Sequence, residues 1–263
     1  MTFTPRLVAL DIDGTLVDGF GEMPPEIHAA VRRVVDAGVP VVLSTGRSWV
    51  ATRPVFEHLG LPPGWAVSAN GAIVVTYPPF EVRRQVRFDP SDVVRQVAAV
   101  APHALIGVQD LNRWRVSRPF PDGELQGDVL VQSIDELCAH EVSRVVVREP
   151  NSSEQVFAEL VAKLGLHEVS YFVGWSAWLD IGPQGVDKAH GLAMVCDDLG
   201  VDPADVLALG DGRNDIEMLQ WAGRGVAIGD APDEVKAAAD IVTGLFDELG
   251  TVAELDRWFP PSP

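Results

Sequence analysis

The sequence contains few cysteines, and its basic residues are outnumbered by acidic ones. The two cysteines, Cys138 and Cys196, lie far apart and belong to no paired motif, so we expect neither a disulfide framework nor a zinc site. With 20 basic against 38 acidic residues, the formal net charge of −18 opposes a non-specific hold on a phosphate backbone. We therefore expect no nucleic-acid partner and attribute the charge to solubility.

Long apolar runs and low-complexity segments are also lacking. No apolar stretch reaches the length that spans a membrane, and the first residues lead into an expected strand rather than a secretion signal. The six histidines are scattered without metal-ligand spacing. We therefore expect a cytoplasmic protein, a monomer or a homodimer, with free thiols and no membrane association.

The 263 residues are 47% hydrophobic and 22% charged, which is typical of a globular protein larger than one average domain. The first part of the chain alternates the two kinds of element, with strands at 7–10, 39–43 and 65–68 and helices at 25–38 and 49–59. The alternation resumes after Gly182, with helices at 187–199 and 215–221 and strands at 206–209 and 226–228. This pattern predicts a parallel sheet with helices on both faces.

In the middle of the chain the regular alternation of strands and helices gives way to a different order of elements, which we interpret as an inserted α+β cap domain at 81–182. The elements expected there are helices at 91–100 and 153–164 and strands at 103–108, 113–116, 142–147, 168–173 and 177–181. The predicted fold class is α/β: a doubly wound, Rossmann-like parallel-sheet core of residues 1–80 and 183–263, split by this insertion.

Two acidic residues directly follow the first expected strand, in the run Asp11-Ile12-Asp13-Gly14-Thr15. An Asp-Gly pair alone is an ordinary turn signal. Alternate residues of a strand point the same way, so both carboxylates can face one site if the extended conformation persists through Asp13. Like charges held close need a cation or a proton between them, and Mg²⁺ prefers such oxygen ligands.

A second acidic cluster follows the strand at 206–209, in the run Gly210-Asp211-Gly212-Arg213-Asn214-Asp215. A calcium loop is excluded by spacing, because Ile216 and Ala222 occupy the positions of its glycine and its closing glutamate. The alternative interpretation, that Asp215 is the N-cap of the next helix, remains and is compatible with a metal role.

Two further polar groups lie at expected element ends. Thr45, in Ser44-Thr45-Gly46-Arg47, offers a hydroxyl, and Lys188, in Gly185-Val186-Asp187-Lys188, offers an ammonium. Taken singly, a helix cap and a solvated charge explain these residues as well. The lysine segment lacks the spacing of a Walker phosphate loop.

These four clusters, in this order, resemble those of the haloacid dehalogenase superfamily and, within it, the Cof-type phosphatases. Ser68-Ala69-Asn70-Gly71-Ala72 also looks like that subfamily. Only 32 residues separate Asp13 from Thr45, whereas 143 separate Thr45 from Lys188, so a cap must lie between the second and third motifs. In this family, that position implies the large α/β cap that closes over small substrates.

The resemblance implies an Mg²⁺-dependent phosphatase acting on a small phosphorylated metabolite, such as a sugar phosphate. Asp11 would attack phosphorus to give an aspartyl phosphate, and Asp13 would protonate the leaving oxygen and then deprotonate water. The implied metal ligands are Asp11, the carbonyl of Asp13, Asp211 and Asp215, the last directly or through water. The implied contacts of the phosphoryl group or substrate are Thr45, Gly46, Arg47, Lys188 and Asn214.

Other functions remain open at this point. A phosphotransferase or mutase would pass the same aspartyl phosphate to a hydroxyl, and a non-catalytic binding protein would keep the fold without turnover. The second alternative is disfavoured because Asp11, Asp13 and Asp211 are all present. Substrate choice is expected to depend on the cap. The cap contains a group of basic and aromatic residues that either contact the substrate or form the charged face of a strand around a core tryptophan: Arg113, Trp114, Arg115 and Arg118.

Overall fold

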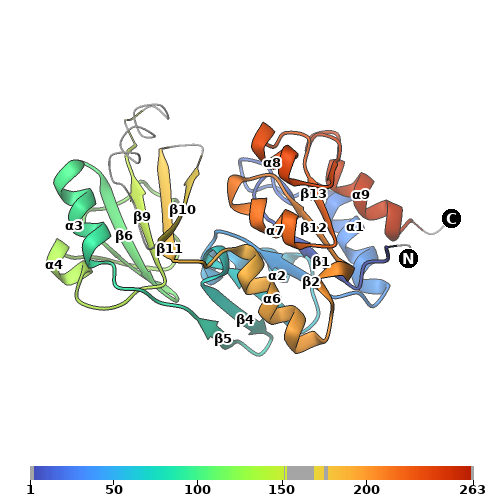
Figure 1. Cartoon of the computed structure of the whole chain (residues 1–263), viewed down its shortest axis with the longest axis horizontal. Coiled ribbons are helices and arrows are strands. Elements are labelled where there is room, and N and C mark those ends of the chain that lie inside the picture. Colours follow the sequence, from blue (N-terminus) through green and yellow to red (C-terminus); the bar gives the residue numbers. More distant parts are fainter. Residues whose placement is uncertain (1–2, 151, 153–168, 175–176, 262–263) are drawn as a thin grey trace.

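The computed structural model of the chain contains two β-sheets that lie at opposite ends of an elongated molecule (Figure 1). The structure describes residues 3–150, 152, 169–174 and 177–261, with residues 169–174 described by their backbone. The helix expected at 153–164 lies outside the described residues.

The first sheet has eight strands in the order β14-β13-β12-β1-β2-β3-β4-β5. The strands from β14 to β3 are parallel, and β4 and β5 extend the sheet antiparallel. Their bounds are β1 Leu7–Leu10, β2 Val41–Ser44, β3 Gly64–Ser68, β4 Ile73–Tyr77, β5 Glu81–Gln85, β12 Val206–Gly210, β13 Arg224–Ala227 and β14 Ile241–Val242.

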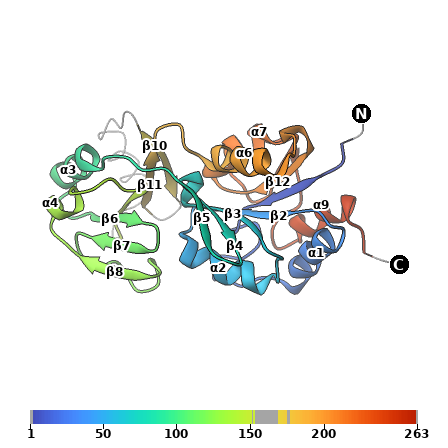
Figure 2. The same ribbon diagram turned by 90° about the horizontal axis from the view of Figure 1, so that it is seen from below.

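Helices cover both faces of this sheet (Figure 2). The first face carries α1 Pro25–Asp36, α2 Trp49–His58 and α9 Gly250–Trp258, and the second carries α6 Lys188–Leu199, α7 Ile216–Trp221 and α8 Asp233–Ala238. Strand β1 shows why both faces are apolar, because Val8 and Leu10 pack with the first set of helices while Leu7 and Ala9 pack with the second. Fully buried strands of this kind place their polar neighbours at the strand ends.

The second sheet has six strands in the order β10-β11-β9-β6-β7-β8 and is antiparallel except for the pair β7 and β8. The bounds are β6 Leu105–Asp110, β7 Arg113–Val116, β8 Asp128–Val131, β9 Arg144–Arg148, β10 Val169–Gly174 and β11 Trp178–Pro183. Helices α3 Ser91–Val100 and α4 Ile134–Leu137 cover one face with an apolar cluster. Alternate residues, including Trp114, Arg144, Trp178 and Asp180, therefore fall on the other face.

The predicted fold class, a doubly wound parallel core with an inserted α+β region, is confirmed. Strand β5 pairs with β4 in the first sheet, although the sequence analysis placed residue 81 onward in the insertion. The division at residues 81 and 182 stays a prediction. Among the described residues, no helix combines the length and the apolar character that crossing a membrane requires.

Candidate active site

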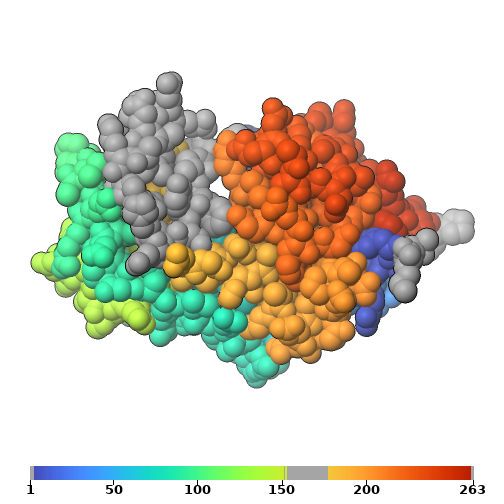
Figure 3. Space-filling view, viewed as in Figure 1, coloured from blue at the N-terminus to red at the C-terminus, as the bar shows by residue number. Residues whose placement is uncertain are grey.

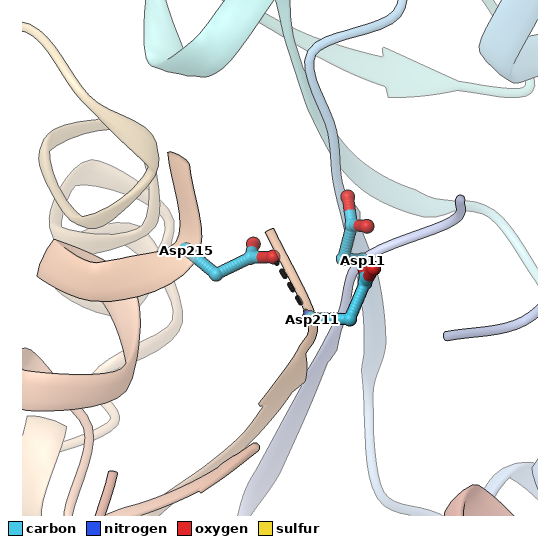
Figure 4. A group of neighbouring side chains, drawn as sticks. All are labelled: Asp11, Asp211 and Asp215. Atoms are coloured by element: carbon cyan, nitrogen blue, oxygen red, sulfur yellow. Dashed lines mark hydrogen bonds between the residues drawn. The ribbon is translucent and has the colours of Figure 1, made fainter. Parts of the chain in front are cut away.

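The carboxyl ends of three neighbouring parallel strands bring the predicted site residues together. Asp11 follows β1, Asp211 follows β12 and Thr45 follows β2, and β1 lies between the other two strands. Ligands collect at this edge of open α/β sheets because the strand order reverses direction there. Figure 4 shows Asp11 and Asp211 side by side, with the Asp215 side chain directed toward them.

Lys188 connects two of these carboxylates from the first residue of α6. Its Nζ donates hydrogen bonds to Asp11 Oδ1 and to Asp215 Oδ1, each at 2.6 Å, and the side chain is 0% exposed. Burial opposes the ammonium charge, but the two carboxylates more than offset it, so the pKa of Lys188 is raised. The interpretation of Lys188 as a solvated charge is therefore wrong.

Asp215 is also fully buried and has all its carboxylate oxygens engaged. Its Oδ2 accepts hydrogen bonds from the backbone N–H groups of Asp211 at 3.0 Å and Gly212 at 2.8 Å. Although Asp215 lies at the start of α7, its side chain does not cap that helix. Its contacts instead fix the loop after β12, which sets the position of Asp211.

Asp11, Asp211 and Asp215 have carboxylate oxygens that all lie within 4.8 Å of one another. Burial is the main reason that the pKa of Asp11 is raised to about 7, since Lys188 lowers it and the neighbouring carboxylates raise it further. Burial, reinforced by the charges of Asp11 and Asp215, raises the pKa of Asp211 to about 8. One ammonium is thus insufficient to neutralise three ionised carboxylates.

This donor set fits a divalent cation with a preference for oxygen. Neither the second oxygen of Asp11 nor the carboxylate of Asp211 accepts a hydrogen bond from any residue that the structure describes. Asp215 differs, because Lys188 and two backbone N–H groups already occupy its oxygens. Asp11 and Asp211 are therefore the carboxylates best placed to bind such an ion.

Asp13 lies outside this buried group. Its carboxylate is 59% exposed and accepts two hydrogen bonds from Arg47, from Nε at 2.9 Å and from a terminal nitrogen at 2.5 Å. Two parallel N–H···O bonds of this kind hold both side chains in one geometry. The structure thus places Asp13 and Arg47 together at the mouth of the site and keeps the Asp13 carboxylate away from the three others.

The remaining predicted residues lie around Asn70, in the turn after β3. Asn70 Oδ1 accepts a hydrogen bond from Asn214 Nδ2 at 2.9 Å, and a side chain at Gly46 would come within 3.1 Å of the same oxygen. Thr45 is buried, and its hydroxyl oxygen accepts the backbone N–H of Arg47 at 3.1 Å. The N-cap of α2 is Ser48, so the interpretation of Thr45 as a helix cap is wrong.

A cavity of about 600 Å³ lies between these residues and the second sheet. Its walls on the first side include Asp11, Asp13, Arg47, Asp211 and Asn214. On the other side they include Trp114, Glu124, Arg144, Trp178 and Asp180. The space-filling view shows green atoms of the second sheet's region and orange to red atoms of the C-terminal region at opposite ends of the molecule (Figure 3).

Known proteins match nearly the whole chain. A family model described as haloacid dehalogenase-like hydrolase matches residues 8–255. The chain belongs to this family. It is an enzyme of the hydrolase class, which confirms the resemblance drawn from the four motif clusters.

Among the relatives of this hydrolase are named phosphatases. A phosphoglycolate phosphatase of Natronomonas pharaonis is 31% identical over 95% of this chain and 96% of the relative. A pyridoxal phosphate phosphatase of Escherichia coli is 29% identical over 92% and 94% of the two chains. Both alignments cover more than nine-tenths of each chain.

Solved structures agree with this fold. A phosphatase of the haloalkanoate (HAD) enzyme superfamily from Bacteroides thetaiotaomicron superposes with a TM-score of 0.77 at 26% identity, covering 97% of this chain and 95% of that one. A HAD subclass IIB sugar phosphatase gives a TM-score of 0.81 at 24% identity, with 96% and 98% coverage.

Sequence reasoning missed several residues that line the cavity of this hydrolase. The sequence pattern did not single out Trp178, Arg144 or Asp180, yet all three line the cavity. The group around Trp114 divides between two faces: Trp114 faces the cavity, whereas Arg115 points the other way and donates to the carbonyl of Glu136. The alternation of residues along the strands indicates which side chains share a face, but which face lies toward the cavity follows only from the register of the sheet.

Proposed function

We propose that this hydrolase is an Mg²⁺-dependent phosphatase that removes the phosphate of a small phosphorylated metabolite through an aspartyl-phosphate intermediate. The observation that carries the proposal is the buried contact of Asp11 with Lys188 beside Asp211, at the end of a cavity of metabolite size. Relatives that act on phosphoglycolate and on pyridoxal phosphate support a small substrate.

Asp11 is the proposed nucleophile. The Asp11 carboxylate offers about four lone pairs, and Lys188 engages only one of them, on Oδ1, so the group can hold a cation and still attack phosphorus through its second oxygen. The attack forms a bond from carboxylate oxygen to phosphorus and breaks the bond from phosphorus to the ester oxygen, so that one displacement becomes two easier ones. Lys188 also holds the Asp11 side chain in a single orientation.

Asp13 is the proposed acid and base. It would donate its proton to the departing alcohol oxygen and later take a proton from the water that attacks the aspartyl phosphate. Because Arg47 binds both Asp13 oxygens, this pairing holds the carboxyl group at the cavity wall. When Asp13 turns to the leaving oxygen, the N–H groups of Arg47 would face the phosphoryl group.

The phosphoryl oxygens would be bound by groups that lie at the carboxyl edge of the sheet. Lys188 supplies positive charge, and Thr45, Gly46 and Asn214 supply polar contacts at the strand ends. Fixed donors of this kind stabilise the charge that develops in the transition state without reorganising.

Mg²⁺ would be held by Asp11, Asp211 and the backbone carbonyl of Asp13, with Asp215 fixing the loop or holding a metal water. When bound, the ion would neutralise the repulsion between an anionic nucleophile and an anionic phosphate.

The test is phosphate release from a panel of sugar phosphates, pyridoxal phosphate and phosphoglycolate, with and without Mg²⁺. Asp11→Asn should lower release by a factor on the order of 10³ or more while the fold stays intact. Asp36→Asn, which removes one exposed carboxylate of α1, is the matched control. Activity in Asp11→Asn equal to that of the control would refute the nucleophile, and release only with an acceptor alcohol would favour a phosphotransferase.

A further inference from the structure

We propose that the alcohol released by this enzyme carries a flat ring and no negative charge, and that Asp18 and Trp178 select it. This inference rests on the proposed function and adds the class of substrate. Three features support it: the charges of the cavity wall, the contacts that already engage its arginines, and Trp178, the one aromatic among the described lining residues that is left partly exposed.

The cavity wall is strongly acidic. Its described lining residues include six carboxylates and two arginines: Asp11, Asp13, Asp18, Glu124, Asp180 and Asp211, with Arg47 and Arg144. Outside the lining, Arg148 pairs with Glu124. A phosphate group can be accepted at one end, where Lys188 and the proposed metal ligands lie. A second anionic group further along the wall would need a cation of its own, because like charges in a partly dry site repel strongly.

Neither arginine is free to supply that cation. Arg47 is bound by both oxygens of Asp13, and once Asp13 turns to the leaving oxygen the guanidinium would face the phosphoryl group. Arg144 is buried and donates from Nε to Asp180 Oδ1 at 2.6 Å and from a terminal nitrogen to Gln109 Oε1 at 3.4 Å. Its guanidinium also lies over the ring of Trp114, 5.4 Å from the centroid. A carboxylate or second phosphate on the substrate would have to break one of these contacts.

Asp18 adds a fixed negative charge. Its Oδ1 accepts the backbone N–H groups of Phe20 at 2.8 Å and Glu22 at 2.9 Å, which hold the half-buried side chain in one place. No described lysine or arginine pairs with it, in contrast to Asp13 and Asp180. Asp18 therefore repels an anionic substituent and favours an ammonium or another hydrogen-bond donor.

Trp178 supplies a flat apolar surface on the opposite wall. Its ring meets Phe120 edge to face, with centroids 6.1 Å apart, and the side chain stays half-buried. Trp114, by comparison, is 3% exposed and packs beneath Arg144. The polar side chains beside Trp178 are bonded to one another, so a ring that stacks suits this wall better than a group that needs many hydrogen bonds.

The experiment compares benzyl phosphate with its 4-aminomethyl and 4-carboxy derivatives, which share one ring and differ only in charge. Wild-type kcat/KM should be about 10-fold or more higher for the 4-aminomethyl ester than for the 4-carboxy ester. Asp18→Asn keeps the oxygen that accepts the two N–H groups but removes the charge, and it should reduce this preference roughly 3- to 10-fold. Glu22→Gln removes an equal charge close by without touching the cavity and should change the preference less than about twofold.

A second comparison tests the ring, using benzyl phosphate against cyclohexylmethyl phosphate. Trp178→Leu should lower the ratio of their kcat/KM values roughly 3- to 10-fold. Trp258→Leu, a change on α9 outside the cavity, should leave the ratio unaltered.

The outcomes separate this inference from the proposed function. Equal turnover of the amino and carboxy esters, or a preference that Asp18→Asn leaves unchanged, would overturn the inference alone. If the enzyme hydrolyses other phosphate esters but none of the benzyl series, the inference about the alcohol is overturned and the proposed function is not. Absence of phosphate release from every ester tested, together with no difference between wild type and Asp11→Asn, would overturn the proposed function itself.

Discussion

Asn70 donates a hydrogen bond from Nδ2 to Oδ2 of Asp180 at 3.0 Å, which joins the turn after β3 to strand β11 of the second sheet. The same Asn70 side chain accepts a hydrogen bond from Asn214 in the loop after β12. Asp180 in turn pairs with the buried Arg144. A continuous series of polar contacts thus runs from the proposed phosphoryl site to the wall that faces the leaving group.

Removing the Asp180 carboxylate should destabilise the protein strongly. Asp180→Ala leaves Arg144 as a buried cation without its partner, and such a loss costs roughly 3 to 5 kcal/mol. Asp180→Asn retains an acceptor and should cost less. Urea unfolding measures both, with Asp205→Ala as control, because its pair with Arg6 is exposed and contributes about 1 kcal/mol or less. Similar losses for Asp180→Ala and Asp205→Ala would contradict this account.

Lys188→Met should lower both stability and activity. The change places an apolar chain of similar length in a fully buried position and leaves Asp11 and Asp215 without their cation, a loss of roughly 3 kcal/mol or more. Phosphate release should fall with it, because Asp11 also loses the group that orients it. Lys236→Met on α8 should be close to wild type in both measurements, because Lys236 forms no ion pair with any described residue. A stable but inactive Lys188→Met would assign the lysine to catalysis alone.

The acidic group should make stability depend on pH and on Mg²⁺. Burial raises the pKa of Asp11 to about 7 and that of Asp211 to about 8, from an ordinary value of 3.8. Without metal, the folded protein keeps these protons between about pH 4 and pH 7 to 8 while the unfolded chain has lost them. The free energy of unfolding should therefore fall as pH rises through that window.

Mg²⁺ should offset this fall, because it binds the deprotonated carboxylates. Thermal unfolding in chelator and in Mg²⁺ at pH 5 and pH 8 provides the measurement. The rise in Tm caused by Mg²⁺ should be larger at pH 8. An equal rise at both pH values would place the bound ion elsewhere.

The strand ends could be predicted from sequence because they depend on local pattern. Runs such as 7–10 and 206–209 are apolar throughout and stop at Asp11 and Asp211, so their position at the carboxyl edge follows from the fold class alone. The role of Lys188 could be inferred only through resemblance to a family. Nothing in its own neighbourhood indicates that its side chain is buried between two carboxylates.

Contacts that depend on which strands pair, and in what register, were not predictable in this way. Arg144 and Asp180 are 36 residues apart, on strands β9 and β11, whose register no short motif encodes. Strand β4 was missed because the Asn70-Gly71 turn resembles the end of the sheet, whereas the chain turns back there and continues it antiparallel. Tertiary placement, rather than local propensity, decides these features.

Substitution of Gly14 by alanine tests whether activity depends on the close approach of the turn after Asp11 to Asp211. The φ of Gly14 is +75°, and a Cβ at this position would lie 2.3 Å from Asp211 Oδ2. Gly14→Ala should therefore push the Asp211 carboxylate out of place, lower phosphate release by about 10-fold or more and raise the Mg²⁺ concentration needed for half-maximal activity.

Gly38 is the matched control, because it separates the clash from backbone strain. Its φ is +77°, and a Cβ there would meet no atom within 4 Å. Both alanine variants bear the left-handed strain of a non-glycine residue, about 1 to 2 kcal/mol, and should lose comparable stability for that reason. Only Gly14→Ala should lose activity and apparent Mg²⁺ affinity. If both variants keep wild-type kinetics, Asp211 has room to move without consequence, and its place among the metal ligands must be reassigned.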